Sequence, residues 1–235
     1  NMRDALFARL YRLNYAASVD WLIAHGRMHP DIAAFTNSYF YHNRLKCLNL
    51  KHQLETELPI NQLYLQPSDT ELTQLTERVT FIPAEVGICP ETYKLNQDEA
   101  SIAANIAYQV YKAFGSRFDV NTSIGIITPY RSQIALIKSK LEEYNELDLS
   151  HILVDTVERF QGSEREVIIY SFCVNAPYQL KFLSNIVVED GVQVDRKLNV
   201  ALTRARRQLF LTGVPSLLKL NPIYKALLEY LRKQK

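Results

Sequence analysis

The chain has 235 residues, enough for one medium-sized domain with a substantial core, and its 47% hydrophobic and 22% charged residues are the usual balance of a soluble globular protein. No apolar run approaches the roughly 20 residues needed to cross a bilayer, and the first residues lack the apolar core of a signal peptide, so we expect neither a membrane span nor export. The net charge of +2 is too small to identify a nucleic-acid partner by itself.

The chain divides into a lead-in and one domain. Residues 1–24 are apolar and helix-like, and we interpret them as the connection from an upstream domain. Residues 25–235 are expected to form the domain itself. Within it, residues 46–76 are polar and weakly periodic with no clear core pattern, which predicts a peripheral excursion. Residues 184–195 contain Asp190-Gly191 between two β-branched runs, which predicts a hairpin insertion without an assigned task.

Five short apolar runs predict the strands. They show no strict alternation of apolar and polar residues, as expected for strands that are covered on both faces. The runs are Val79–Ile82, Ile124–Thr128, Ile152–Val154, Val167–Phe172 and Leu209–Gly213. Because helical patterns lie between them, they predict an α/β fold with a mainly parallel sheet flanked by helices.

The clearest helix is predicted after Asn96, whose side chain can cap it, while Glu99 can reach back to complete a capping box. Its apolar stripe repeats with a period near 3.6 and comprises Ile102, Ala103, Ile106, Ala107, Val110 and Phe114. A second helix is predicted after Pro129, with Ile134, Ile137 and Leu141 on one face.

No spacing in the chain is typical of a metal site. The three cysteines (Cys47, Cys89 and Cys173) are widely spaced and form no CxxC pair, so we expect reduced thiols in a cytoplasmic protein, or a nuclear one in a eukaryote. His25 and His29 lie one helical turn apart but have no acidic or thiol partner at metal spacing, so a structural role is the preferred interpretation.

Arg204 is predicted to lie on a helix just before the strand Leu209–Gly213, so it would project from a rigid element. A planar, always-charged guanidinium in that place suits a phosphate whose negative charge grows in a transition state. The alternative is an ordinary salt-bridged surface arginine, which the pattern alone favours. The same short stretch is basic throughout and also contains Arg196, Lys197, Arg206 and Arg207.

The segment Asp155–Glu164 is predicted to end one strand, turn and begin another. Gly162 gives the backbone freedom to turn or to approach a ligand, and the polar Gln161 and Glu164 flank it. Thr156 lies at the carboxyl end of a strand, where open α/β sheets usually bind ligands, and its hydroxyl can position a nucleic-acid phosphate without reading bases. An ordinary polar turn is the alternative.

Thr128, Pro129 and Tyr130 likewise follow a predicted strand and precede a helix. Tyr130 can stack on a base, because aromatic stacking binds single strands without sequence preference. It can equally be a core residue, since the chain has 14 tyrosines.

Together these segments resemble the motifs of the second RecA-like motor domain of superfamily 1 helicases, in the branch that includes the nonsense-mediated-decay RNA helicase and related DNA helicases. RMHP at 27–30 resembles motif IV, and residues 126–133 resemble the TPY segment that follows it. VDTVERFQGSE at 154–164 resembles motif V, and LNVALTRAR at 198–206 resembles motif VI. Residues 6–10 resemble the stretch that precedes motif IV, and all the segments occur in the family's order.

The resemblance implies a RecA-like fold of the P-loop NTPase type and ATP-driven movement along single-stranded DNA or RNA. It implies that Arg204 is the arginine finger on the γ-phosphate and that Arg27 is a second phosphate-contacting arginine. By the same likeness, the nucleotide's ribose would lie near Gln161, Gly162 and Glu164. The resemblance also implies single-strand contacts from Thr128, Pro129, Tyr130 and Thr156.

Other features separate the chain from a complete ATPase. None of the seven glycines is followed by lysine, so the sequence has no GxxxxGK[ST] loop, and no acidic pair follows a strand as in a Walker B motif. We therefore expect ATP and Mg²⁺ to be bound mainly by an upstream RecA-like domain of the same polypeptide, and this chain alone to hydrolyse no ATP.

Gly26 is a departure from the family pattern, which usually has at this position the tyrosine that stacks on the adenine. The alternative hypothesis is therefore a non-catalytic nucleic-acid-binding module with a degenerate helicase fold. Arg27, Glu164 and Arg204 argue against it, because loss of function would erode those positions as readily as others.

Overall fold

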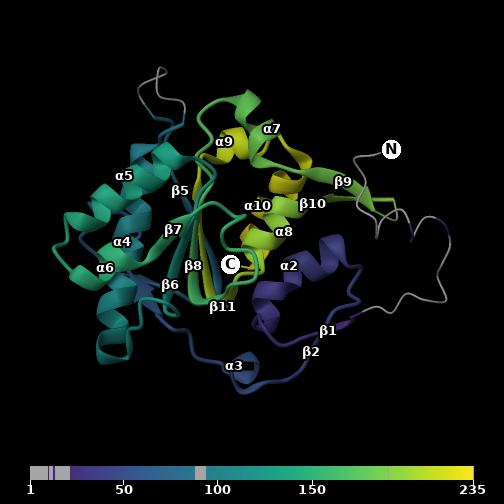
Figure 1. Ribbon diagram of the computed structural model, residues 1–235, viewed down its shortest axis with the longest axis horizontal. Helices are drawn as coiled ribbons and strands as arrows, with labels where there is room; N and C mark the ends of the chain where they lie inside the picture. The colour runs from purple at the N-terminus through teal and green to yellow at the C-terminus, as the bar shows by residue number, and fades with distance from the viewer. Residues whose placement is uncertain (1–9, 11–12, 14–21, 88–93, 190, 235) are drawn as a thin grey trace.

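A five-stranded parallel sheet forms the centre of the computed structural model, which describes residues 10, 13, 22–87, 94–189 and 191–234 (Figure 1). The strand order is β5-β11-β8-β6-β7 and every pair of neighbours is parallel. The strands are β5 (Val79–Pro83), β6 (Ile124–Ile127), β7 (Leu153–Asp155), β8 (Arg165–Ser171) and β11 (Ala205–Gly213). All five predicted strands are confirmed, whereas the lead-in at residues 1–24 lies almost wholly outside the described residues.

Helices cover both faces of the sheet, which confirms the α/β RecA-like fold (Figure 1). One face packs against α4 (Gln97–Phe114), α5 (Arg131–Glu142) and α6 (Leu147–His151). The other packs against α2 (Pro30–Phe40), α8 (Arg196–Leu202) and α10 (Pro222–Gln234), while the short α9 (Pro215–Leu218) lies beside α10. None of the helices in the described ranges is long and apolar enough to cross a membrane.

The strands read as continuous apolar runs because each supplies two cores. Along β8, Ile168 joins the core under α2, α8 and α10, and the next residue, Ile169, joins the core under α4 and α5. Leu209 and Phe210 of β11 divide between the two cores in the same way. Successive side chains of a strand point to opposite faces, so both faces must be apolar.

Residues 46–76 form short elements around the sheet: β2 (Lys46–Cys47), α3 (Lys51–Leu54), β3 (Gln62–Leu63) and β4 (Thr73–Gln74). β1 (Ala24–His25) pairs with β2 in parallel, and β3 pairs with β4 in antiparallel orientation. Although the sequence shows no core pattern here, three apolar side chains of the segment are buried under α4 and α5: Ile60, Leu63 and Leu75.

The hairpin expected in residues 184–195 is present. β9 (Ile186–Glu189) and β10 (Val192–Asp195) pair in antiparallel orientation, with Glu189 opposite Val192 and Gly191 at φ +80° in the turn. The buried Asp195 then caps α8 by accepting from the backbone N–H groups of Lys197 and Leu198. It also accepts a hydrogen bond of 2.9 Å from the hydroxyl of Tyr224 in α10.

α4 begins as predicted at its cap but not in its capping box. The Asn96 side chain accepts from the backbone N–H of Glu99 at 2.8 Å, which confirms the cap. The prediction that the Glu99 side chain accepts from the Asn96 N–H is wrong, because this N–H donates to the Gln133 side chain. The Glu99 carboxyl is fully buried and accepts from Ser171 Oγ (2.7 Å) and the backbone N–H of Cys173 (2.8 Å). Glu99 therefore joins the helix to the end of β8.

The environment of Glu99 favours its protonated form. Burial raises its pKa to about 8, although hydrogen bonds from Cys173 and Ser171 act in the opposite direction. Cys173 has a left-handed backbone (φ +49°), so its N–H is turned out of the strand direction and meets this carboxyl. The Cys173 and Cys47 thiols are free, and Cys89 lies outside the described residues.

Glu99→Gln is expected to flatten the pH dependence of stability. The Glu99 pKa rises from 4.5 to about 8 on folding, so its stabilising contribution is full below the unfolded pKa and is lost as the pH rises through the folded pKa. At about 1.4 kcal/mol per pH unit, the free energy of unfolding of the native protein falls over this pH range by an amount on the order of 5 kcal/mol. Urea unfolding at about pH 5 and about pH 8 measures it. The amide oxygen still accepts from Ser171, so an unchanged pH dependence in the variant would contradict the role of Glu99.

Candidate functional site

The predicted site residues lie at two opposite edges of the sheet. Thr128, Pro129 and Tyr130 follow β6, and Thr156 follows β7, so these four mark the carboxyl edge. Glu164 precedes β8 and Arg204 precedes β11, so they mark the amino edge. Arg27, between β1 and α2, joins this second group through Glu164.

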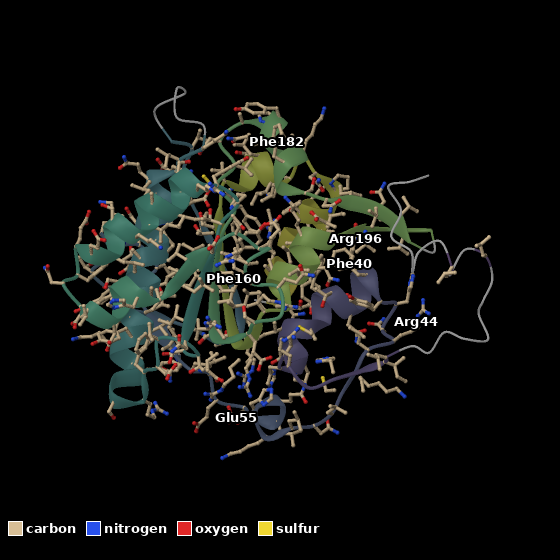
Figure 2. All side chains as sticks on the ribbon, in the orientation of Figure 1. Phe40, Arg44, Glu55, Phe160, Phe182 and Arg196 are labelled. Atoms are coloured by element: carbon tan, nitrogen blue, oxygen red, sulfur yellow. The ribbon has the colours of Figure 1, made fainter. Side chains whose placement is uncertain are left out.

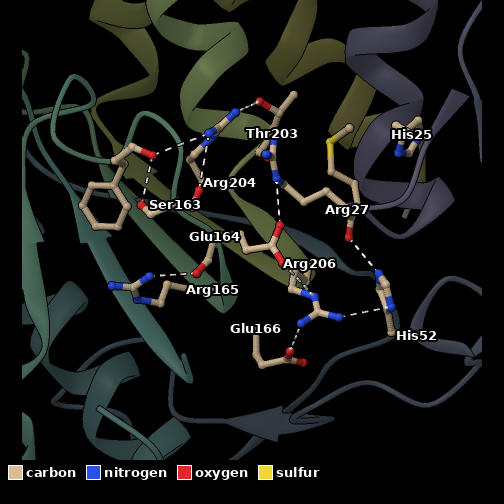
Figure 3. Close-up of polar contacts among 12 residues, drawn as sticks. His25, Arg27, His52, Ser163, Glu164, Arg165, Glu166, Thr203, Arg204 and Arg206 are labelled. Atoms are coloured by element: carbon tan, nitrogen blue, oxygen red, sulfur yellow. Dashed lines mark hydrogen bonds and ion pairs between the residues drawn. The ribbon is translucent and has the colours of Figure 1, made fainter. Parts of the chain in front are cut away.

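At the amino edge, the Glu164 carboxylate links two arginines (Figure 3). Arg27 Nε donates to Glu164 Oε2 at 3.0 Å, and Arg206 Nε lies 3.5 Å from Oε1. Arg27 also donates to the carbonyl of Thr203 at 3.4 Å. Arg27 and Glu164 remain 33% and 42% exposed, so a ligand from the solvent can reach both.

The backbone that carries Arg27 is fixed on β11. The N–H of His29 donates to the carbonyl of Arg206 at 2.8 Å. The His29 side chain then caps α2 by accepting from the N–H of Asp31. The buried Gln53 amide donates to the carbonyls of His25 and Met28, so the backbone is held on both sides of Arg27.

Arg204 is buried, with 8% of its surface exposed, and it does not lie on the helix that was predicted to carry it. α8 ends at Leu202 and β11 begins at Ala205, so Arg204 lies in the turn between them and not on the helix. The reason is that the short helix closes at Thr203, whose N–H returns to Asn199. The guanidinium folds back over this turn instead of projecting.

The Arg204 guanidinium bonds only to neutral oxygens in the described structure (Figure 3). It donates to the carbonyls of Val200 (3.1 Å), Ser163 (3.3 Å) and Phe160 (3.5 Å) and to the Thr203 hydroxyl (3.2 Å). Burial, and secondly the charge of Arg27, lower the Arg204 pKa to about 10, while Glu164 acts in the opposite direction. A bound anion would relieve this excess of positive charge, so the site fits a phosphate group.

His52 and Glu166 also lie at this edge, where the sequence pattern indicates only the basic stretch around Arg204. His52 Nε2 lies 2.9 Å from the carbonyl oxygen of Arg27, and His52 Nδ1 lies 3.3 Å from Arg206. Arg206 and Arg207 also form ion pairs with Glu166 at 3.3 and 3.5 Å. Through these contacts, residues 46–76 and β8 both lie next to the segment that carries Arg27. The contacts join residues far apart in the sequence, so only the fold reveals them.

Gly26 has no free space beside it. A Cβ at Gly26 would lie 3.0 Å from Leu50 Cδ1 and 3.3 Å from Leu48 Cδ1. Leu48 and Leu50 are 57% and 44% exposed, so they form a small aliphatic surface there. A tyrosine at this position, as in the family pattern, would have to displace both leucines.

At the carboxyl edge, Thr128 is fully buried and its hydroxyl has no hydrogen-bond partner. Thr128 and Pro129 line a small cavity of about 50 Å³, together with Val157, Glu158 and Lys197. A cavity of this size holds at least one water molecule. The unsatisfied hydroxyl therefore lies beside a space that a polar ligand atom can enter.

Two of the side chains that line this cavity form an ion pair. Lys197 Nζ lies 3.3 Å from the Glu158 carboxylate. Burial acts to raise the Glu158 pKa, but hydrogen bonds from its own N–H and from Thr156, with the Lys197 charge, leave it lowered. The Tyr130 hydroxyl is buried without a partner, and burial raises its pKa to about 12.

Two segments run between the edges. The turn 156–163 begins with Thr156 at the carboxyl edge and ends with Ser163 at the amino edge. Beside it lie α8, which carries Lys197 in its first turn, and the short turn after α8 that carries Arg204. The Lys197–Glu158 ion pair joins them at one end, and the bonds from Arg204 to Phe160 and Ser163 join them at the other. Gln161 and Gly162 (φ +86°) are exposed, as are Glu158 and Arg159 earlier in the turn.

Phe160 fixes the turn on the sheet. Its ring is fully buried against Gly125 of β6, where a Cβ would lie 2.5 Å from Phe160 Cε1. The described residues contain no group of three or more histidine, cysteine, aspartate or glutamate side chains that could hold a metal ion. The one close thiol–imidazole contact described there joins Cys47 Sγ and His25 Nε2 at 3.4 Å.

Comparison with known proteins gives a consistent family. Residues 2–216 match the model of a family described as an AAA domain. The chain is 30% identical to helicase sen1 of Schizosaccharomyces pombe, over 97% of this chain and 12% of that protein. It is 32% identical to the DNA replication ATP-dependent helicase/nuclease DNA2 of Xenopus tropicalis, over 92% of this chain and 21% of that protein.

A third relative is the regulator of nonsense transcripts 1 of Dictyostelium discoideum, which is 29% identical over 99% of this chain and 16% of its own length. The chain therefore spans less than a quarter of each of these three relatives.

Gly125→Ala is expected to destabilise the domain by about 1–3 kcal/mol, because the added methyl group overpacks the Phe160 ring and the site cannot expand freely. Urea unfolding measures the loss. Gly87→Ala is the matched control, since the nearest heavy atom to its added Cβ lies at 3.6 Å, an ordinary contact. Equal free energies of unfolding of the two variants would show that the packing of the Phe160 ring does not depend on the missing side chain at Gly125.

Proposed function

This chain belongs to the AAA domain family, as the C-terminal RecA-like domain of a superfamily 1 helicase in the branch related to the nonsense-mediated-decay helicase, and we propose that it supplies an arginine finger and single-strand contacts to an ATP-dependent helicase or translocase. The observation that carries this proposal is the buried Arg204. Its guanidinium is held by neutral oxygens next to Arg27, at the end of two segments that reach the opposite edge of the sheet.

Arg204 and Arg27 are proposed to contact the phosphates of ATP. When bound, ATP with Mg²⁺ supplies the phosphoryl transfer whose free energy drives movement. The two arginines place positive charge where negative charge develops, and their hydrogen bonds hold them there in advance. Glu164 orients Arg27, and with Gln161 and Gly162 it is proposed to lie near the ribose. The phosphate loop and the main Mg²⁺ ligands are proposed to come from another RecA-like domain of the same polypeptide.

The single strand, DNA or RNA, is proposed to lie along the carboxyl edge. Thr128 offers an unsatisfied hydroxyl beside a cavity, and Pro129, Tyr130 and Thr156 lie beside it. Such groups suit contacts to phosphate and sugar, which carry no sequence information. The turn 156–163, and α8 with the turn that follows it, each reach both edges. A movement of Arg204 on nucleotide binding is therefore transmitted to the strand groove, which is the proposed path of the strand past Thr128, Pro129, Tyr130 and Thr156.

The second candidate function is a non-catalytic nucleic-acid-binding module. The observation in its favour is Gly26, where Leu48 and Leu50 fill the place of the family's tyrosine. An aliphatic surface stacks on a base less specifically than an aromatic ring. This candidate keeps the carboxyl-edge contacts but predicts no role for Arg204 in catalysis.

Arg204→Ala in the full-length helicase that contains this chain is expected to lower strand-stimulated ATP hydrolysis by at least about two orders of magnitude, as for other arginine fingers, with strand binding largely kept. Arg204→Lys is expected not to restore the rate, because a lysine lacks the planar fork. Arg232→Ala, an exposed change on α10, is the control. An unchanged rate in a folded variant, or a native protein without ATPase activity, would favour the binding module.

Thr128→Val is expected to weaken single-strand binding about 10- to 150-fold, the range of one hydrogen bond to a charged group. The variant should have the same Tm as the native protein, because the Thr128 hydroxyl has no hydrogen-bond partner to lose. Thr212→Val makes the same change at another buried hydroxyl without a partner, away from the cavity, and should bind normally. Fluorescence anisotropy with a labelled strand measures both. Native affinity in Thr128→Val would remove Thr128 from the strand site.

A further inference from the structure

A large aromatic ring is exposed next to the proposed strand groove. Phe182 lies on the short helix α7 (Leu180–Leu183), and 63% of its surface is exposed (Figure 2). Its neighbours Leu180 and Leu183 are buried, and Leu183 lines the same cavity as Thr128. α7 is therefore anchored in the protein while the Phe182 ring remains in water, where a ligand at the cavity beside Thr128 can reach it.

The surroundings of Phe182 are basic. Lys197 Nζ lies 3.4 Å from the Phe182 carbonyl oxygen, and Lys197 lines the cavity beside Thr128. Lys181, the residue before Phe182, is exposed. The acidic Glu158 is already paired with Lys197. An exposed aromatic ring on a segment that also carries or contacts lysines, near a buried hydroxyl, is the composition of sites that bind single strands by stacking and backbone attraction.

The ring is also held in orientation. Tyr178, in the preceding turn η4 (Pro177–Gln179), has its ring centroid 6.4 Å from that of Phe182, with the ring planes at 86°. Such a perpendicular pair is favourable, so it restricts the rotation of Phe182 before any ligand binds. A restrained ring stacks on a base with less loss of freedom than a mobile one.

We propose that Phe182 is a stacking site for a nucleobase of the single strand whose backbone passes Thr128 and Lys197. This inference rests on the proposed single-strand function and deepens it by adding a contact to the bases. Every nucleobase has a π face, so the site accepts any sequence. The 235-residue chain then holds the strand from two sides, by its backbone in the groove and by one base on α7.

The test measures strand affinity in the full-length helicase by fluorescence anisotropy, for DNA and RNA strands and for an abasic strand with the same number of phosphates. Phe182→Ala is expected to weaken binding of the base-containing strands about 5- to 150-fold, the range of one base–aromatic stack, and to leave the abasic strand unchanged. Phe182→Trp should keep native affinity. Phe182→Leu, which is apolar without a π face, should behave like Phe182→Ala.

The outcomes separate the two proposals. If Phe182→Leu binds like the native protein, or if Phe182→Ala weakens the abasic strand equally, the ring is an apolar contact or a structural one and stacking is overturned. If Phe182→Ala binds normally while Thr128→Val is weakened, the stacking site fails and the strand groove stands. If the native helicase binds none of the strands, the proposed strand function fails and the stacking site fails with it.

Discussion

The contact between Phe160 and the bare backbone of Gly125 fixes the path of the turn 156–163 across the sheet. Because β6 has no side chain at that point, an aromatic ring can lie directly on the strand and bring the turn close. Arg204 then finds the carbonyls of Phe160 and Ser163 within hydrogen-bond distance. The position of the buried guanidinium thus depends on a missing methyl group in a neighbouring strand.

Charge at the amino edge is arranged before any ligand arrives. The Arg27 guanidinium is close enough to Arg204 to lower the pKa of Arg204, and the Glu164 carboxylate acts in the opposite direction. The protein tolerates this repulsion because hydrogen bonds and packing hold both side chains. The phosphate contact proposed for these arginines would therefore require little reorganisation, which is the condition under which electrostatic catalysis is strongest.

The sequence predicted what depends on local chemistry. The five strands are visible because two-sided burial makes each run apolar, and Asn96 is visible because a cap acts on the next turn. Long-range contacts left no such signal. Glu99 matches a capping box by its spacing, yet its partners lie more than seventy residues away on β8 and its end. Family resemblance named Arg27, Glu164 and Arg204, but only the fold brings the first of them to the other two.

Asp195 separates the tip of the hairpin from the start of α8. It closes the hairpin, caps α8 and accepts from Tyr224 of α10, so the start of α8 is set by this one carboxylate and not by the hairpin tip. Evolution can therefore lengthen, shorten or replace the tip around Gly191 without moving the helix that leads to Arg204. The hairpin tip is therefore a place where insertions or deletions can accumulate while the arrangement around Arg204 stays the same.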